Sequence, residues 1–283
     1  MESLHGTDLL SLADLSSEQL SYLLDLAAQL KSGKITPTCP NKVLGLVFSK
    51  ASTRTRVSFS VAMYQLGGQV LDLNAGITQM GRGEPVQDTA RVLDRYLDVL
   101  AIRTFAQSDL ETFAEYASIP VINALTDLEH PCQILADLLT VQEEFGDLQG
   151  LTMTYLGDGN NVAHSLMLGC ALAGMNIRLG CPEGYQPLPA VVEQTKAIAG
   201  DRGDVVITAD PIAAVQDAQV LYTDVWASMG QEDLADDRSK IFPPYQINHD
   251  LLQHADPKAI VLHCLPAYRG KEITDAVMEG EQS

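Results

Sequence analysis

Short apolar runs alternate with amphipathic stretches along almost the whole chain, and this alternation constrains the fold more than any other feature of the sequence. Residues 43–48 (Val-Leu-Gly-Leu-Val-Phe) predict a buried strand, and residues 53–66 carry apolar side chains at helical spacing before Gly67 and Gly68 end the pattern. Strands that alternate with helices form parallel sheets, because each helix returns the chain to the start of the next strand. The sequence therefore predicts an α/β fold built on doubly wound parallel sheets.

The alternation runs in two series, separated by the sequence Gly-Asp-Leu-Gln-Gly at residues 146–150. A chain of 283 residues suits two domains of ordinary size. We therefore predict one domain over residues 1–146 and a second over residues 147–283. The expected strands are 43–48, 69–73, 99–102, 121–122, 152–156, 176–179, 204–207, 220–222 and 259–262, and the expected helices are 53–66, 88–97, 110–117, 131–145, 162–173, 190–199 and 247–255.

Charge and cysteine content exclude several classes of protein. The formal net charge of −19 disfavours binding to nucleic acid and to anionic membranes. No apolar run reaches the roughly 18 residues that a membrane helix needs, and the first residues lack the pattern of a secretory signal, so we expect a cytoplasmic protein. The five cysteines, at positions 39, 132, 170, 181 and 264, include no CxxC pair, which argues against a disulfide framework and a structural zinc site.

An arginine-rich turn, Ser52-Thr53-Arg54-Thr55-Arg56, joins the first predicted strand to the next predicted helix. Hydroxyl and free backbone N–H groups at the N-terminus of a helix attract anions, and guanidinium groups add bidentate hydrogen bonds. The alternative is a capped helix with two solvated arginines. However, capping needs only one hydroxyl, and arginine in the first turn opposes the helix dipole. The turn therefore favours an anion site.

Two further segments of the first half carry polar groups where a strand ends or a helix begins. Arg103 follows the predicted strand 99–102, and ligands of open α/β sheets bind beyond the carboxyl ends of strands. In residues 130–133 (His-Pro-Cys-Gln), the imidazole can donate to a carbonyl oxygen, and the glutamine oxygen can accept from an amide. Each segment also has a plainer explanation: a surface salt bridge for the arginine, and a helix cap beside an ordinary histidine.

Three segments of the second half follow predicted strands. Residues 157–161 (Gly-Asp-Gly-Asn-Asn) suggest a dinucleotide-binding turn, but Val162 stands where that motif has its third glycine, and two asparagines can equally bind a carboxylate or cap a helix. Asp224 can hold an ammonium group or belong to an ordinary turn. Cys264 is either a buried thiol or a thiol whose pKa is lowered by a neighbouring cation.

All of these segments lie at the carboxyl ends of strands, where a crevice would form. They offer an anion site, groups that recognise an amide, and groups suited to an amino acid. The sequence shows no nucleophile–base pair, metal cluster or phosphate P-loop. This combination indicates an enzyme that joins two small substrates by positioning them.

The motifs STRTR, HPCQ, GDGNN, DVWASMG and HCLPAYRG, in this order, closely resemble those of the ornithine carbamoyltransferases. The resemblance runs from about Leu4 to the end of the chain, and the SMG and HCLP sequences distinguish the ornithine branch from the aspartate branch. It implies two doubly wound domains with the active site in the cleft between them. It also implies transfer of the carbamoyl group of carbamoyl phosphate to the δ-amine of L-ornithine, which gives L-citrulline and phosphate in arginine biosynthesis. The transfer implied by the resemblance needs no metal and no organic cofactor.

The resemblance assigns roles to individual residues. It implies that carbamoyl phosphate is bound by Ser52, Thr53, Arg54, Thr55, Arg103, His130 and Gln133. It implies that ornithine is bound by Asn161, Asp224, Ser228 and Met229, with Cys264 near the reacting δ-nitrogen. The backbone carbonyls of Cys264 and Leu265 are expected near the carbamoyl group. The members of these two sets expected to take part in catalysis are Arg54, Arg103, His130, Asp224 and Cys264. Gln79 is expected to reach carbamoyl phosphate in a neighbouring subunit of a homotrimer.

Three alternatives stay open. Members of the family continue beyond Ser283 into a final helix that returns to the first domain with an arginine for carbamoyl phosphate. The resemblance therefore leaves room for a carbamoyltransferase-like protein that is inactive or impaired without this helix. An NAD-binding oxidoreductase is suggested by Gly157 and Gly159. A carbamoyltransferase for another amine is the third alternative, against which the expected amino-acid contacts of Asp224 and Asn161 argue.

Overall fold

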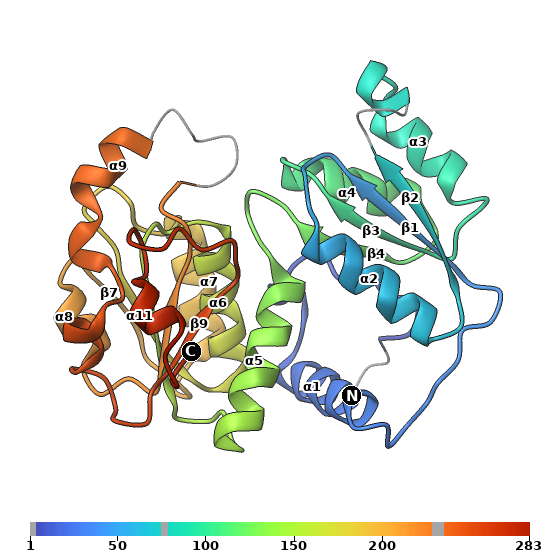
Figure 1. The fold of residues 1–283 in the computed structure, drawn as a ribbon. Helices are drawn as coiled ribbons and strands as arrows, with labels where there is room; N and C mark the ends of the chain where they lie inside the picture. The colour runs from blue at the N-terminus through green and yellow to red at the C-terminus, as the bar shows by residue number, and fades with distance from the viewer. Residues whose placement is uncertain (1–3, 75–78, 228–234) are drawn as a thin grey trace. The chain divides into compact units, whose positions relative to one another are not determined.

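The computed structural model describes residues 4–74, 79–227 and 235–283. By its contacts the chain divides into two compact units, Met1–Cys132 and Gln133–Ser283 (Figure 1). Each unit has a central parallel sheet flanked by helices, which confirms the predicted fold class. The domain boundary predicted near residue 146 lies one helix later in the chain than this division.

The sheet of the first unit has four parallel strands in the order β2-β1-β3-β4. The chain moves outward from β1 to β2 and then returns to β3 on the other side, so the direction of winding reverses between β1 and β3. Such a switch point leaves a crevice at the carboxyl ends of the two strands. The strands are β1 (Val43–Phe48), β2 (Gln69–Asn74), β3 (Val99–Arg103) and β4 (Val121–Leu125).

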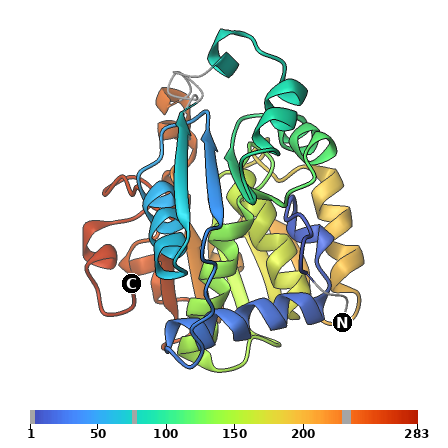
Figure 2. The same cartoon turned by 90° about the vertical axis from the view of Figure 1, so that its right-hand side faces the viewer.

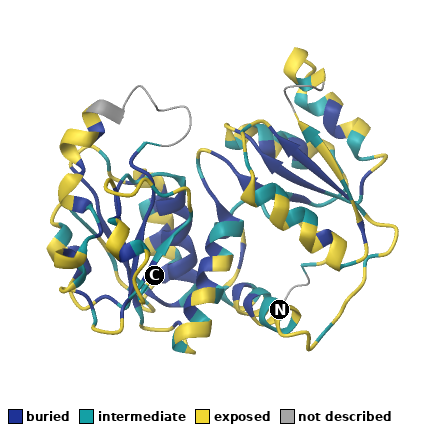
Figure 3. Ribbon diagram, viewed as in Figure 1, coloured by how far each residue is buried: buried dark blue, intermediate teal, exposed yellow. Residues whose placement is uncertain are grey.

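Helices cover both faces of this sheet (Figure 2). Leu46 and Phe48 pack with Met63 of α2 on one face, whereas Val47 packs with Leu110 of α4 on the other. The central strands are therefore buried, while the edge strand β2 stays largely exposed (Figure 3). The helices are η1 (Leu12–Asp14), α1 (Ser17–Lys31), α2 (Arg54–Gln65), η3 (Gln79–Arg82), α3 (Val86–Leu93) and α4 (Gln107–Tyr116), followed by α5 (Pro131–Phe145), whose first two residues belong to this unit.

The sheet of the second unit has five parallel strands in the order β7-β6-β5-β8-β9. The chain winds outward from β5 through β6 to β7, and then crosses back to β8 and β9. The switch point of this sheet therefore lies between β5 and β8. The strands are β5 (Thr152–Leu156), β6 (Asn176–Gly180), β7 (Val205–Thr208), β8 (Val220–Thr223) and β9 (Ile260–His263).

Helix α6 (Asn161–Ala173) forms the centre of this unit, because its residues from Val162 to Leu172 are all buried. It contacts α7 and β6, and a separate cluster that includes Leu156, Ala214 and Val261 packs α8 and α10 against the sheet. The other helices are α7 (Pro189–Ala199), α8 (Pro211–Val215), α9 (Ala235–Ile241), η5 (Pro243–Tyr245), α10 (His249–Leu252) and α11 (Asp275–Met278). Within the described ranges, none of the helices has the length and apolar composition needed to cross a membrane.

Candidate active site

The arginine-rich turn lies at the carboxyl end of β1, beside the switch point of the first sheet. Helix α2 begins at Arg54, and the preceding residue Thr53 makes no side-chain capping hydrogen bond to the described part of the helix. Arg56 forms an ion pair with Asp72, and its guanidinium lies 4.7 Å from the centre of the Phe48 ring. Arg54 is exposed. Arg56 therefore has a structural role, whereas the Thr53 hydroxyl and the Arg54 guanidinium can receive a ligand.

Arg103 ends β3 next to this turn. Its Nη1 donates to Oγ1 of Thr55 over 3.4 Å, and its backbone carbonyl accepts from the N–H of Ser49 over 2.8 Å. The side chain is buried, unlike an arginine in a surface salt bridge. The structure thus brings two separate sequence predictions together at the switch point between β1 and β3.

His130 lies directly before α5 and is buried. Burial lowers the pKa of its imidazole to about 3, and the positive charge of Arg103 is a second cause. The ring is therefore neutral at physiological pH. A neutral imidazole still has one N–H, so it can donate a hydrogen bond to a carbonyl oxygen as the sequence predicts.

Gln79 is exposed and begins η3, and its contact with a neighbouring subunit stays a prediction. The residues that follow it line a pocket of about 370 Å³ together with the ends of β1 and β3. Glu84 and Asp109 supply the charges of this pocket, and its lining includes neither arginine nor lysine. The pocket is therefore poorly suited to a phosphate, in contrast to the arginine-rich turn.

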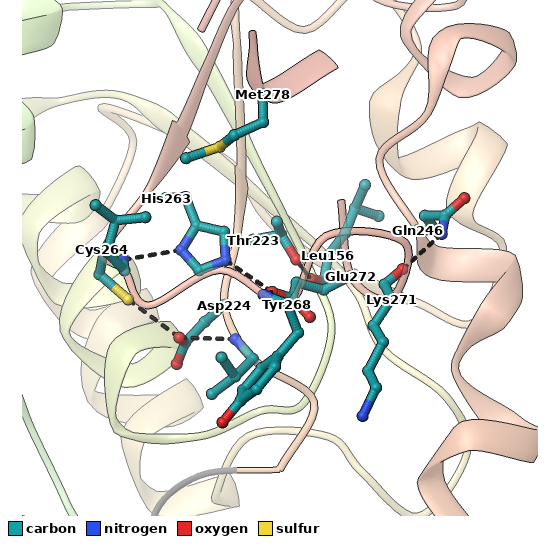
Figure 4. A network of polar contacts seen from close by, with 12 residues as sticks. Leu156, Thr223, Asp224, Gln246, His263, Cys264, Tyr268, Lys271, Glu272 and Met278 are labelled. Carbon is teal, nitrogen blue, oxygen red and sulfur yellow. Dashed lines mark hydrogen bonds and ion pairs between the residues drawn. The ribbon is translucent and has the colours of Figure 1, made fainter. Parts of the chain in front are cut away.

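Asp224 follows β8 at the switch point of the second sheet and is buried. Its Oδ2 accepts from Nδ2 of Asn160 over 2.9 Å. Its Oδ1 accepts from the thiol of Cys264 over 3.1 Å and from the N–H of Val225 over 2.8 Å (Figure 4). The loops after β5, β8 and β9 thus meet at one carboxylate, as expected for residues at the carboxyl ends of neighbouring parallel strands.

The protonation of Cys264 differs from one sequence expectation. A neighbouring cation would lower the pKa of the thiol, but its actual neighbour is a carboxylate. Burial, and then the negative charge of Asp224, raise the pKa of Cys264 well above its ordinary value. Of the two alternatives that the sequence leaves open, the structure therefore supports the buried thiol, and Cys264 is a neutral thiol that donates a hydrogen bond to Asp224.

The loop that carries Cys264 and Leu265 is held by two buried side chains (Figure 4). Nδ1 of His263 accepts from the N–H of Leu265 over 2.9 Å, so the ring proton belongs on Nε2, which lies 3.2 Å from Oε1 of Glu272. The same Oε1 accepts from the N–H of Tyr268 over 2.5 Å. Leu265 itself is exposed and has a φ of 58°. These contacts fix the shape of the loop.

One group of side chains has a spacing that a metal ion could use. Asp224, His263 and Cys264 each offer one possible ligand atom, and these three atoms lie within 4.8 Å of one another. However, both ring nitrogens of His263 already have hydrogen-bond partners in Leu265 and Glu272, and the Cys264 thiol is protonated. Metal ligation requires a free imidazole nitrogen and a thiolate, so the arrangement fits a metal ion poorly.

The two adjacent asparagines differ in their contacts. Asn160 is the N-cap of α6, which is one of the two roles that the sequence leaves open for the asparagines. Its side chain also contacts Asp224, which the sequence does not indicate. Asn161 is the half-buried first residue of α6, and its binding to the carboxylate of ornithine stays a prediction. Ser228 and Met229 lie outside the described residues.

Two groups of buried side chains near these loops were not predicted, one joined by an ion pair and the other by hydrogen bonds. Arg238 of α9 pairs with Asp158 over 2.6 Å and also donates to the carbonyl oxygen of Trp226. Asp137 of α5 contacts Gln133, one helical turn earlier. The spacing of Gln133 and Asp137 on one helix face is a signal that the sequence does contain. The partners of Arg238 are too far along the chain for any local pattern to indicate them.

Comparison with known proteins accounts for both units. Residues 7–143 match a family model described as "Aspartate/ornithine carbamoyltransferase, carbamoyl-P binding domain", and residues 149–283 match "Aspartate/ornithine carbamoyltransferase, Asp/Orn binding domain". Ornithine carbamoyltransferases of Nostoc punctiforme and Synechocystis sp. are 69% and 66% identical over 283 residues, which is 100% of this chain and 92% of each relative.

Solved structures of ornithine carbamoyltransferases are similar to this chain over most of its length. The ornithine carbamoyltransferase of Pyrococcus furiosus is 47% identical with a TM-score of 0.94, over 100% of this chain and 92% of that one. The enzyme of Gloeobacter violaceus is 59% identical with a TM-score of 0.89, over 97% and 90% of the two chains. The chain therefore belongs to the aspartate/ornithine carbamoyltransferase family.

Proposed function

We propose that the chain is an ornithine carbamoyltransferase, which transfers the carbamoyl group of carbamoyl phosphate to the δ-amine of L-ornithine and releases L-citrulline and phosphate. The observation that carries the choice of ornithine is the carboxylate of Asp224 with the neutral thiol of Cys264 beside it. A buried carboxylate attracts an ammonium group and repels the second carboxylate of aspartate. The names of the relatives support the same choice and favour neither the inactive alternative nor an oxidoreductase.

The groups at the switch point of the first sheet suit carbamoyl phosphate. Hydroxyl groups and free N–H groups at the start of α2 would hold the phosphate, together with the exposed guanidinium of Arg54. Arg103 would bridge the phosphate and the carbonyl oxygen, and the neutral imidazole of His130 would donate to that oxygen. Gln133 would accept from the carbamoyl NH₂. The residues assigned to the phosphate are Ser52, Thr53, Arg54 and Thr55.

The loops at the switch point of the second sheet suit ornithine. Asp224 would attract an ammonium group, Asn161 would bind the carboxylate, and Cys264 would lie near the reacting δ-nitrogen. Ser228 and the backbone of Met229 would complete the contacts to the amino-acid end. The carbonyl oxygens of Cys264 and Leu265 would face the carbamoyl group.

The reaction needs an uncharged amine. The δ-ammonium of ornithine, with an ordinary pKa of about 10.4, first loses a proton. The nitrogen lone pair then forms a bond to the carbamoyl carbon, and the carbonyl oxygen gains negative charge. Arg103, His130 and Arg54 stabilise that charge. The bond between the carbon and the phosphate oxygen breaks next, and the leaving phosphate takes the electron pair and can accept the second proton of the amine.

We further propose a homotrimer with Gln79 reaching a neighbouring subunit, a cytoplasmic location and a role in arginine biosynthesis. Exposed apolar side chains at helical spacing on α2 support assembly: Val57, Val61 and Tyr64. All five cysteines are free, which suits a reducing compartment. Citrulline formation is the step that would feed arginine synthesis.

The proposal is tested by incubating the purified protein with carbamoyl phosphate and ornithine and measuring citrulline. We expect turnover with ornithine and none with aspartate or putrescine in its place. Absence of citrulline at saturating concentrations of both substrates would overturn the proposed activity. Faster turnover with putrescine than with ornithine would show that the assignment of the amino-acid contacts is wrong.

A further inference from the structure

Asp137 is a buried carboxylate that the reaction described above does not use. It lies on α5, one turn after Gln133. Its Oδ1 accepts from Nε2 of Gln133 over 3.0 Å, and its Oδ2 accepts from the phenol of Tyr222 on β8 over 2.9 Å. Each oxygen of the carboxylate therefore has a donor, the glutamine at Oδ1 and the phenol at Oδ2.

This contact determines which end of the Gln133 amide is left for a ligand. A carboxamide has a donor end, the NH₂ group, and an acceptor end, the oxygen. An ionised carboxylate can only accept, so the NH₂ of Gln133 must face Asp137. The Oε1 of Gln133 is then presented as an acceptor. With the amide turned over, an NH₂ group would face the ligand instead.

We propose that Asp137 is a positioning residue that orients the amide of Gln133, so that the site selects carbamoyl phosphate over acyl phosphates that lack an N–H donor. The inference rests on the proposed function, because it takes the carbamoyl NH₂ as the partner of Gln133. Acetyl phosphate is the discriminating probe, since it has the same phosphate and carbonyl groups but a methyl group in place of the NH₂.

A carboxylate is an unfavourable side chain for a purely structural contact at this buried position. Burial raises its pKa to about 7, against the hydrogen bonds from Gln133 and Tyr222, which lower it. The charged form is therefore destabilised by its surroundings, and an apolar side chain would join α5 to β8 at lower cost. Orientation of an amide, in contrast, requires an acceptor at this position.

The experiment compares the binding of carbamoyl phosphate and acetyl phosphate by titration calorimetry at about pH 8.5, where the carboxylate is ionised. Asp137→Leu removes the acceptor and keeps a side chain of similar size. We expect it to weaken carbamoyl phosphate about 10- to 100-fold, the effect of one lost hydrogen bond to a desolvated group, and to change acetyl phosphate less than about threefold. Asp137→Asn retains an acceptor oxygen and should restore most of the selectivity.

Two controls separate orientation from stability. Glu144→Leu changes an exposed acid on the same helix and should leave both affinities unchanged. Gln133→Ala should lose the same selectivity as the double variant Gln133→Ala/Asp137→Leu, because Asp137 acts only through the glutamine. If Asp137→Leu does not fold, Asp137→Ala also removes the acceptor and adds no bulk.

Equal losses for the two ligands in the Asp137 variants, or undiminished selectivity, would overturn the inference. So would a further loss of selectivity in the double variant. The calorimetric ratio does not depend on turnover. Absence of citrulline with the wild-type protein would therefore contradict the proposed function separately, while the ratio would still report on Asp137.

Discussion

Two acids near the switch point of the second sheet differ in whether their charge is compensated. Asp158 pairs with the guanidinium of Arg238. The contacts of Asp224 within the described ranges are with an amide, a thiol and a backbone N–H, all of them neutral. A buried carboxylate without a cation beside it favours a positively charged ligand. The attraction between the two charges compensates for the interaction with water that the carboxylate loses on burial. Asp224 is therefore the acid that suits ornithine, and Asp158 is structural.

The first prediction concerns Asp224. Asp224→Ala should raise the KM for ornithine at least about 30-fold, because a buried charge pair contributes roughly 2–5 kcal/mol when one partner is removed. The KM for carbamoyl phosphate should change less than about threefold. Steady-state kinetics with each substrate varied in turn measures both values. Asp237→Ala, at an exposed acid, is the control and should change neither. Equal increases for the two substrates would contradict the division of labour between the units.

The second prediction concerns the pH dependence of stability. The pKa of His130 is lowered to about 3 in the folded chain, mainly by burial, and is near 6.5 when unfolded. The unfolded state therefore binds a proton that the folded state does not, so stability is full above about pH 6.5 and falls as the pH drops toward 3. When the pH is lowered from 8 to 5, the free energy of unfolding of His130→Gln should fall by about 2 kcal/mol less than that of the wild type. Thermal melts at both values measure this, and parallel pH dependences would refute it.

At the residue scale, the sequence indicated which residues are candidates for the site better than it indicated which side chains contact them. Arg103 and the arginine-rich turn were found because position after a strand and before a helix is local information. The sequence left open whether Cys264 is a buried thiol or a thiol with a lowered pKa, because its neighbour, Asp224, comes from another strand of the sheet. The ion pair of Arg238 with Asp158 and the contact of Asp137 with Tyr222 were missed for the same reason, since each joins segments far apart in the chain.

Several elements of the fold followed from the periodicity of the sequence. The predicted bounds of β1, α5 and β5 coincide with the structure. The short helices α8, α9 and α11 were not predicted, because four to seven residues are too few to display a helical period. Helix α1 was also not predicted, although Ser16 and Gln19 form a capping box, which is a sequence pattern typical of the start of a helix.

The third prediction belongs to the start of α6. Asn160 caps the helix through Oδ1, which accepts from the N–H groups of Val162 and Ala163, and it contacts Asp224 through Nδ2. Asn160→Ser keeps a capping oxygen and loses the second contact, whereas Asn160→Ala loses both. We expect the alanine variant to be about 1 kcal/mol less stable than the serine variant, and both to raise the KM for ornithine by a similar factor. Thermal melts and kinetics separate the two roles, and equal stabilities would show that the cap is unimportant.

The arrangement of the strands explains how segments far apart in the sequence come together at two sites. Sequence alternation predicts parallel sheets but leaves the order of the strands open, because every order of parallel strands has the same local pattern. The observed orders place the turn after β1 beside Arg103 of β3, and the loop after β5 beside Asp224 after β8. In each unit several of the candidate residues therefore lie at the switch point of the sheet, which is where open α/β sheets bind ligands.

The last prediction concerns assembly. Val57, Val61 and Tyr64 form an exposed apolar stripe on α2, next to the exposed edge strand β2. Because α2 also carries Arg54, a contact made by this stripe would link assembly to the carbamoyl phosphate site. Val61→Glu places a charge in the stripe and should weaken association at least about 100-fold if the stripe is buried between subunits. Ile212→Glu on α8 is the matched control, since Ile212 is 48% exposed and Val61 is 44% exposed. Sedimentation across a range of concentrations should show a smaller species only for Val61→Glu, and unchanged assembly of that variant would remove α2 from the interface.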